Sequence, residues 1–142
     1  MILLNSSLTD SVISMSELDE ELKTFGFHLS DNWDYEHGYY DYLLADDEGY
    51  HFLRIPFTVK TGTLDSPDDN SLIRISEPFV LSHIYQDGLD DQVKEGNFRA
   101  VFDQFQEPKD KDGKVPEQYV QMGRELLSQV EHKLSSKLGK ED

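Results

Sequence analysis

The sequence has 142 residues, with 29 acidic and 13 basic side chains and a formal net charge of −16. This charge repels nucleic-acid phosphates and anionic lipids, so we expect neither nucleic acid nor a membrane as a partner. Solubility is the simplest explanation of the charge, and attraction to a cationic partner or a metal is the alternative. The absence of cysteine excludes disulfides, thiolate nucleophiles and cysteine-bound zinc.

No apolar run approaches the ~20 residues that span a bilayer. The first residues, Met1–Leu4, lack the basic flank and the apolar length of a signal peptide. By elimination we expect a cytoplasmic protein.

The first thirty residues predict short strands around one helix. Ile2–Leu4 predicts a strand that can extend toward Leu8, and Val12–Ile13 predicts a second extended piece. Ser16 suits the N-cap of a helix because acidic residues follow in the first turn. The apolar stripe of this helix consists of Leu18, Leu22 and Phe25, and Gly26 should end it before a short strand at 27–29.

Two aromatic and β-branched runs, Trp33–Leu44 and Tyr50–Thr61, should organise the chain. Such residues favour a pleated, half-buried surface. Ala45–Gly49 between them is short, polar and ends in glycine, as a hairpin loop requires. We therefore predict a long β-hairpin on which the other elements pack.

The hairpin register predicts which side chains share a face. A turn centred on Asp47 and Glu48 pairs Asp46 with Gly49 and Tyr42 with Leu53. The core face of the second strand is then the apolar one, since a one-residue slip would expose it; it carries His51, Leu53, Ile55, Phe57 and Val59. The opposite face carries Trp33, Tyr35, His37, Tyr39 and Asp41 from the first strand and Tyr50, Phe52 and Arg54 from the second. Asp41 opposite Arg54 makes a cross-strand charge pair of roughly 0.2–1 kcal/mol.

Gly38 leaves an alternative open. A glycine inside a strand often marks a β-bulge, which would exchange the faces of the residues before it. Trp33 and Tyr35 would then join the core, and Asp34 and Glu36 would point outward. We favour the bulge slightly, because burying two aromatic rings is more favourable than burying two carboxylates.

The middle of the chain predicts a loop, a strand and a weak helix. The loop covers 62–70, and the strand Leu72–Tyr85 should bend or lie at an edge at Pro78. With the hairpin this strand suggests an antiparallel meander. A turn at 87–91, a helix over Phe98–Gln104 and a charged loop over Glu107–Lys114 should follow.

The clearest predicted helix covers about 116–138 and opens with Pro116 in its first turn. Its apolar stripe includes Gly123, which would allow close backbone approach to the sheet. The stripe could instead form a coiled-coil seam, so a homodimer is an alternative.

Several segments carry a family resemblance: Gly26-Phe27, Trp33-Asp34-Tyr35, Tyr40-Asp41, the Leu53-Arg54 strand that ends in Gly62, and Ile84-Tyr85 followed by Gly88. Together they resemble the YugN-like proteins of Bacillus-type bacteria over residues 1–90. The resemblance implies a bacterial cytosolic origin, and it transfers no activity and no catalytic residues.

Histidines give the strongest hint of chemistry. His37, His51 and His83 lie on long predicted strands, with Asp34, Glu36 and Asp41 nearby. Two histidines and a carboxylate bind zinc or iron in many proteins. No H-x-H or H-E-x-x-H pair and no Gly-x-Ser-x-Gly elbow occurs, so structural histidines are the simpler interpretation and we assign neither a metal nor a cofactor.

The sequence thus predicts a single α+β domain over 1–142: an antiparallel sheet of about five strands, packed by a short N-terminal and a long C-terminal helix. We expect a non-enzymatic binding or regulatory protein that contacts an unknown protein partner. The candidate surface consists of Trp33, Tyr35, His37, Tyr39, Asp41, Phe52, Arg54 and His83. The alternative is a ligand-binding or metal-dependent enzyme that uses histidine, aspartate and arginine side chains on the sheet.

Overall fold

The predicted hairpin is the centre of the fold in the computed structural model, which describes residues 1–30, 36–47, 49–61, 71–84 and 115–140. Its strands are β4 (His37–Asp46) and β5 (Gly49–Thr61). Tyr42 pairs with Leu53 and Asp41 with Arg54, which confirms the predicted register along the middle of the hairpin. At the tip the prediction was wrong, because Asp46 pairs with Tyr50 and not with Gly49.

The third long strand is broken in two. β6 (Leu72–Ile75) pairs with the C-terminal half of β5, and β7 (Phe79–Ile84) pairs with its N-terminal half, both antiparallel. The break contains Pro78, which cannot donate a ladder hydrogen bond. The predicted bend and the predicted meander are both confirmed.

Shorter strands complete the sheet. β1 (Ile2–Leu3) pairs with β7, and β2 (Ser11–Ser14) pairs with β6. β3 (His28–Leu29) lies beside β4, and β8 (Gly139–Lys140), which the sequence did not predict, lies beside β2. Within the described residues the antiparallel sheet has eight strands, which is more than the predicted five. The predicted third long strand is divided into β6 and β7, and β8 was not predicted.

Helix α1 covers Met15–Phe25 and begins earlier than predicted. Its N-cap is Ser14, whose hydroxyl accepts a hydrogen bond from the Glu17 backbone N–H at 3.2 Å, so the prediction of Ser16 was wrong. An acidic residue follows both Ser14 and Ser16 within three positions, so the sequence alone does not show which serine is the N-cap. Gly26 ends the helix with a φ of 107°, the left-handed conformation that glycine adopts readily.

Helix α4 covers Glu117–Leu134 and ends four residues before the predicted Leu138. Its buried stripe faces the sheet and consists of Tyr119, Val120, Gly123, Leu127, Val130 and Leu134. A Cβ built on Gly123 would lie 2.6 Å from Val80 Cγ2, so α4 approaches β7 as closely as glycine permits. Neither helix of the described chain is long and apolar enough to span a membrane.

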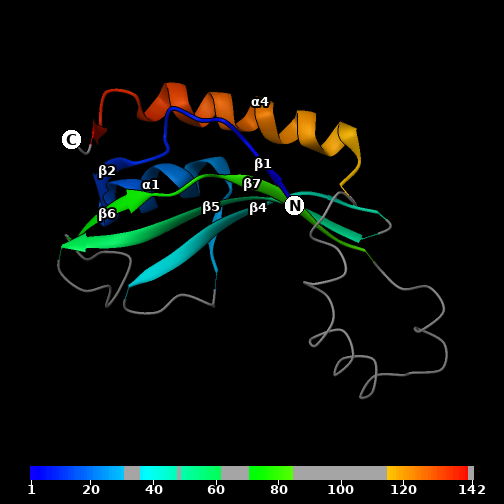
Figure 1. Ribbon diagram of the computed structural model, residues 1–142, viewed down its shortest axis with the longest axis horizontal. Helices are drawn as coiled ribbons and strands as arrows, with labels where there is room; N and C mark the ends of the chain where they lie inside the picture. Colours follow the sequence, from blue (N-terminus) through cyan, green and yellow to red (C-terminus); the bar gives the residue numbers. More distant parts are fainter. Residues whose placement is uncertain (31–35, 48, 62–70, 85–114, 141–142) are drawn as a thin grey trace, which may run out of the picture.

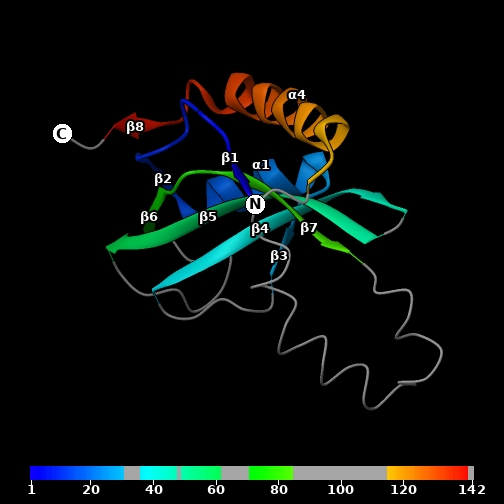
Figure 2. The ribbon, with the colours of Figure 1, turned by 45° about the vertical axis from the view of Figure 1, so that its right-hand side comes forward.

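Both helices lie on the same side of the sheet (Figures 1 and 2). We call this side the inner face and the opposite side the outer face. The inner face and the helices enclose the core, together with Leu4 and Leu8 from the segment between β1 and β2. That segment is fixed to α4 by Glu131, which accepts hydrogen bonds from the Ser6 hydroxyl at 2.7 Å and from the Ser7 backbone N–H at 3.2 Å.

Several predictions fall outside the described residues. They are the strand segment with Trp33 and Tyr35, the loop over 62–70, the turn at 87–91, the helix over 98–104 and the loop over 107–114.

Candidate functional site

The faces of the hairpin are set by the position of its bulge. Gly38 pairs with Phe57 in continuous register, and the register shifts between Leu43 and Ala45 instead. The preferred prediction of a bulge at Gly38 was therefore wrong, and the unbulged alternative is confirmed. Gly38 lies buried on the inner face opposite a phenylalanine ring, where an absent side chain leaves space.

Three of the predicted surface residues form a compact cluster on the outer face. Arg54 donates to both carboxylate oxygens of Asp41, from Nε at 2.7 Å and from Nη2 at 2.9 Å. The Arg54 guanidinium also lies 4.6 Å from the centre of the Tyr39 ring, within cation–π range. The two charged side chains are 19% and 17% exposed. This bidentate pair therefore neutralises the charge near the middle of the outer face.

Apolar side chains continue the outer face from that ion pair toward β7 and toward the hairpin tip. In an antiparallel sheet, residues directly opposite each other share a face. Leu43, Phe52 and Leu81 form one such row, and Arg54, Phe79 and Leu3 form the next. Leu3 is 52% exposed, Leu43 46% and Tyr50 38%. We define the outer apolar patch as Leu3, Leu43, Tyr50, Phe52, Phe79 and Leu81.

His83 belongs to the margin of this patch. It pairs with Tyr50 across β5 and β7, and its ring lies 6.1 Å from that of Phe52 in an edge-to-face arrangement. Phe52 in turn lies 6.2 Å from Tyr50. Two of the predicted surface residues, Phe52 and His83, thus lie beside each other.

The structure separates the histidines that could have shared a metal. His51 lies buried on the inner face, whereas His37 and His83 belong to the outer face. His37 pairs with Thr58 and His83 pairs with Tyr50, so eight residues of β5, or ~27 Å, separate them. Among the described residues, no group of three or more histidine and carboxylate side chains could hold a metal ion.

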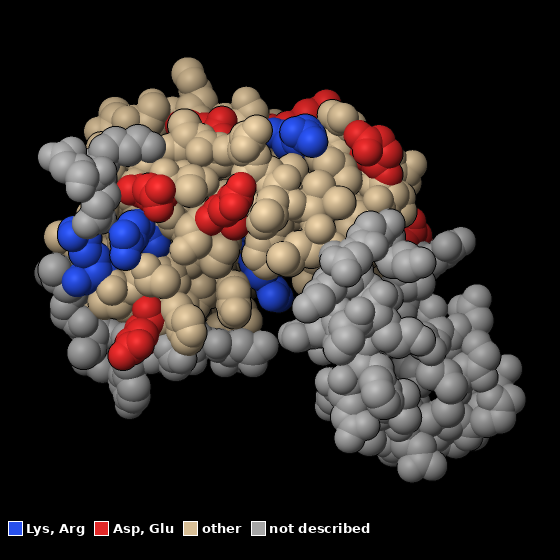
Figure 3. Space-filling view, in the orientation of Figure 1, with Lys and Arg blue, Asp and Glu red and all other residues tan. Residues whose placement is uncertain are grey.

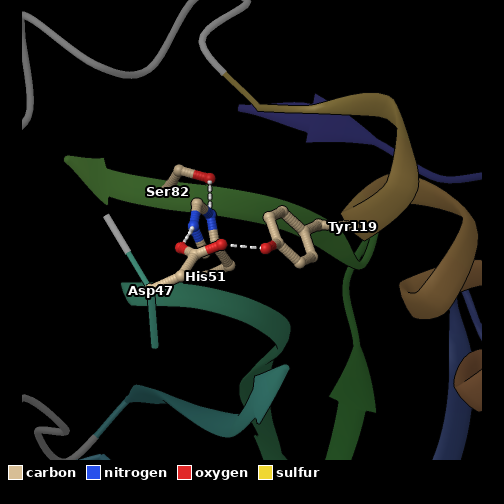
Figure 4. A network of polar contacts seen from close by, with 4 residues as sticks. All are labelled: Asp47, His51, Ser82 and Tyr119. Carbon is tan, nitrogen blue, oxygen red and sulfur yellow. Dashed lines mark hydrogen bonds and ion pairs between the residues drawn. The ribbon is translucent and has the colours of Figure 1, made fainter. Parts of the chain in front are cut away.

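His51 instead belongs to a polar network beneath α4 (Figure 4). Its Nδ1 lies 2.6 Å from Ser82 Oγ, and its Nε2 lies 2.8 Å from Asp47 Oδ1. Tyr119, in the first turn of α4, donates its hydroxyl to the other oxygen of Asp47 and stacks its ring on the imidazole at 4.1 Å. Because the Asp47 carboxylate only accepts, a neutral His51 carries its proton on Nε2 and accepts from the Ser82 hydroxyl.

The network contains the residue types of a catalytic triad, but its burial indicates a structural role. A nucleophilic serine must present its oxygen to a substrate. Ser82 and His51 are each only 1% exposed. The network therefore fixes the β4–β5 turn, β7 and α4 to one another. Sequence reasoning placed His51 on the core face and missed its partners, which come from distant parts of the chain.

A second buried polar contact anchors α1 to the sheet. The Tyr40 hydroxyl donates to Asp19 at 2.5 Å, and Lys23 pairs with the same carboxylate at 3.1 Å. Burial, and then the hydrogen bond and the charge of Asp19, raise the pKa of Tyr40 far above its ordinary value. This contact satisfies polar groups inside the core and offers no accessible site.

Comparison with known proteins supports the resemblance seen in the sequence. The YugN-like family model matches residues 3–134. The chain belongs to the YugN-like family. "Uncharacterized protein YugN" from Bacillus subtilis (strain 168) is 34% identical over 131 residues, which cover 92% of this chain and 96% of that protein.

A crystal structure supports the YugN-like fold independently. The "uncharacterized conserved protein YugN" from Geobacillus kaustophilus HTA426 superposes with a TM-score of 0.71 over 96% of both chains, at 23% identity. At this identity the likeness bears on the fold alone, and it agrees with the predicted α+β architecture. The names of these relatives state no activity, so the role of the outer face has to be argued from its geometry.

Proposed function

We propose that this YugN-like protein is a non-enzymatic binding or regulatory protein that contacts another protein through the outer apolar patch. The observation that supports this proposal best is the outer apolar patch itself, in which Leu3, Leu43 and Tyr50 are each more than a third exposed. Contiguous exposed apolar surface of this kind is characteristic of interaction sites. The neutral Asp41–Arg54 pair beside it lets a partner cover this region without burying an unpaired charge.

Helix α4 is a poorer candidate for that contact. Its apolar stripe already packs on the sheet, and the side chains that it turns outward are mainly polar: Gln118, Gln121, Arg124, Glu125, Gln129 and His132. A dimer through a coiled-coil seam on this stripe would require the helix to leave the core. A homodimer, if one forms, would have to use another surface.

The alternative of a metal-dependent or ligand-binding enzyme has little geometric support. Of its histidines, His51 lies on the inner face, whereas His37 and His83 lie on the outer face. The charged groups of Asp41 and Arg54 are hydrogen-bonded to each other. We therefore prefer a protein that acts in the cytoplasm on another protein, with neither nucleic acid nor a membrane as its target. The net charge of −16 supports this preference.

Site-specific photo-crosslinking tests the proposal. A photoreactive benzoylphenylalanine replaces Tyr50 in the patch or, as a matched control, exposed Gln129 on α4. In a Bacillus-type host, irradiation should give a discrete protein adduct from position 50 and none from position 129. No adduct from position 50, or the same adducts from both positions, would count against the patch as the contact surface.

A further inference from the structure

Charged side chains are unevenly placed along the outer face. At the hairpin tip, exposed Asp46 lies opposite Tyr50 on the outer face, whereas neighbouring Asp47 directs its carboxylate to His51 and Tyr119 and keeps 48% of its side chain exposed. Arg74 pairs with Thr58 at the other end of β5, four residues or ~13 Å beyond Arg54. Figure 3 shows Lys and Arg side chains over that β2–β6 end of the molecule, with Asp and Glu side chains among them. The apolar patch is therefore bordered by exposed Asp46 at the hairpin tip, whereas Arg74 lies toward the other end of β5.

The charge of the whole chain bears on what can cover the patch. A second copy would bring another −16 against an equally acidic molecule. Salt screens this repulsion beyond ~8 Å at physiological ionic strength, but charges at a shared interface lie closer than that. The acidic protein attracts a partner with basic side chains and repels a second copy of itself, both during encounter and in the bound complex.

We propose that the occupant of the outer apolar patch is a protein segment that combines apolar side chains with lysine or arginine. The apolar side chains cover Leu43, Phe52 and Leu81, and the basic ones lie next to Asp46 at the hairpin tip. This inference rests on the proposed function and adds the chemical class of the partner. It also predicts binding that weakens as salt concentration rises.

The test uses two synthetic amphipathic peptides with the same leucine pattern, one with lysine and the other with glutamate at every polar position. Each is titrated into the full-length ¹⁵N-labelled protein, and amide shifts report where it binds. The lysine peptide should shift the amide resonances of outer-face residues in β4, β5 and β7. It should bind about tenfold more tightly than the glutamate peptide, and its binding should weaken at ~0.5 M salt.

Three variants make the test specific. Leu43→Ser removes an apolar contact without changing the charge of the protein, and it should weaken binding of the lysine peptide severalfold. Asp46→Asn should reduce the preference for lysine over glutamate. Met122→Ser, at a side chain 41% exposed on α4, is the matched control and should change neither.

The contrary results separate the two proposals. Equal binding of both peptides at the patch would overturn the basic partner and leave the patch as a contact surface. Lysine-peptide shifts spread over α4, with no effect of Leu43→Ser, would mean unspecific attraction to an acidic protein and would overturn the inference. Self-association of the protein alone that Leu43→Ser abolishes would identify a second copy as the occupant, and would also overturn it.

Discussion

The inner and outer faces of the hairpin use the same kinds of residue for different purposes. Tyr40 on the inner face is fully buried, and its hydroxyl is bonded to Asp19. Tyr50 on the outer face is 38% exposed. Leu53 is fully buried, whereas Leu43 on the preceding strand is 46% exposed. The difference shows that alternation along a strand fixes only the side on which a residue lies, and that the helices determine which side becomes the core.

The largest effect should come from Leu53 on the inner face. Leu53→Ala removes a fully buried side chain and leaves a cavity, so it should lower the free energy of unfolding by about 2–5 kcal/mol. Denaturant unfolding monitored by circular dichroism measures the change. A loss below about 1 kcal/mol would mean that the inner face is not the main core.

Gly123→Ala tests how closely the inner face is covered. The added methyl would meet Val80 at 2.6 Å, so α4 or β7 must shift, at a cost of about 1–3 kcal/mol. Ser128→Ala, on the exposed side of the same helix, is the control and should change stability little. If the two variants proved equally stable, the close approach of α4 to β7 would be in doubt.

Alkaline pH should reveal the buried hydroxyl of Tyr40. Its folded-state pKa is raised, so the protonated form favours the folded state. The stabilisation is complete below the unfolded pKa of ~10 and declines above it, by about 1.4 kcal/mol per pH unit from this residue. Unfolding curves between about pH 9 and 11 should show this decline, and Tyr40→Phe should lessen it. An unchanged pH dependence in Tyr40→Phe would contradict the assignment.

Arg54→Ala tests how strongly the ion pair on the outer face is shielded from solvent. The pair of Arg54 with Asp41 is bidentate and partly shielded from solvent. We therefore expect the substitution to lower the free energy of unfolding by about 1–2 kcal/mol, which lies between the values for exposed and buried pairs. Thermal unfolding with Asp41→Ala and the double variant isolates the pair energy. A coupling of 3–5 kcal/mol would show that the pair is buried.

The smallest effect on stability should come from Leu43→Ser. The side chain lies on the outer face and is nearly half exposed, so the substitution should change the free energy of unfolding by about 0.5 kcal/mol or less. The same variant should reduce partner binding, because Leu43 belongs to the patch and lies opposite Phe52. A large loss of stability would instead place Leu43 in the core.

Alternation and turn chemistry were enough to predict the hairpin, its central register, the break at Pro78 and the helix stop at Gly26. The position of the bulge was not predictable, because it depends on tertiary packing. Leu44 is the extra residue, and its Cδ1 lies 3.8 Å from the Cβ position of Gly123 on α4. Local sequence at Gly38 suggested a bulge and contains no information about this distant contact.

The polar network shows the same limit for the site. Ser82 is 31 residues from His51, and Tyr119 is 72 residues from Asp47. No sequence spacing connects them, and only the pairing of β5 with β7 and the placement of α4 bring them together. The outer cluster was predictable to the extent that one cross-strand pair, Asp41 and Arg54, follows from the register.

The most direct test of the central claim asks whether binding can be removed from the outer face while the fold remains intact. The crosslinker stays at position 50, and adduct yield and melting temperature are measured for the parent, for Leu43→Ser and for Met122→Ser. We predict that Leu43→Ser loses most of the adduct at an unchanged melting temperature and that Met122→Ser keeps both. Full adduct yield in Leu43→Ser, or a loss only in proportion to unfolding, would contradict the assignment of the outer face to partner binding.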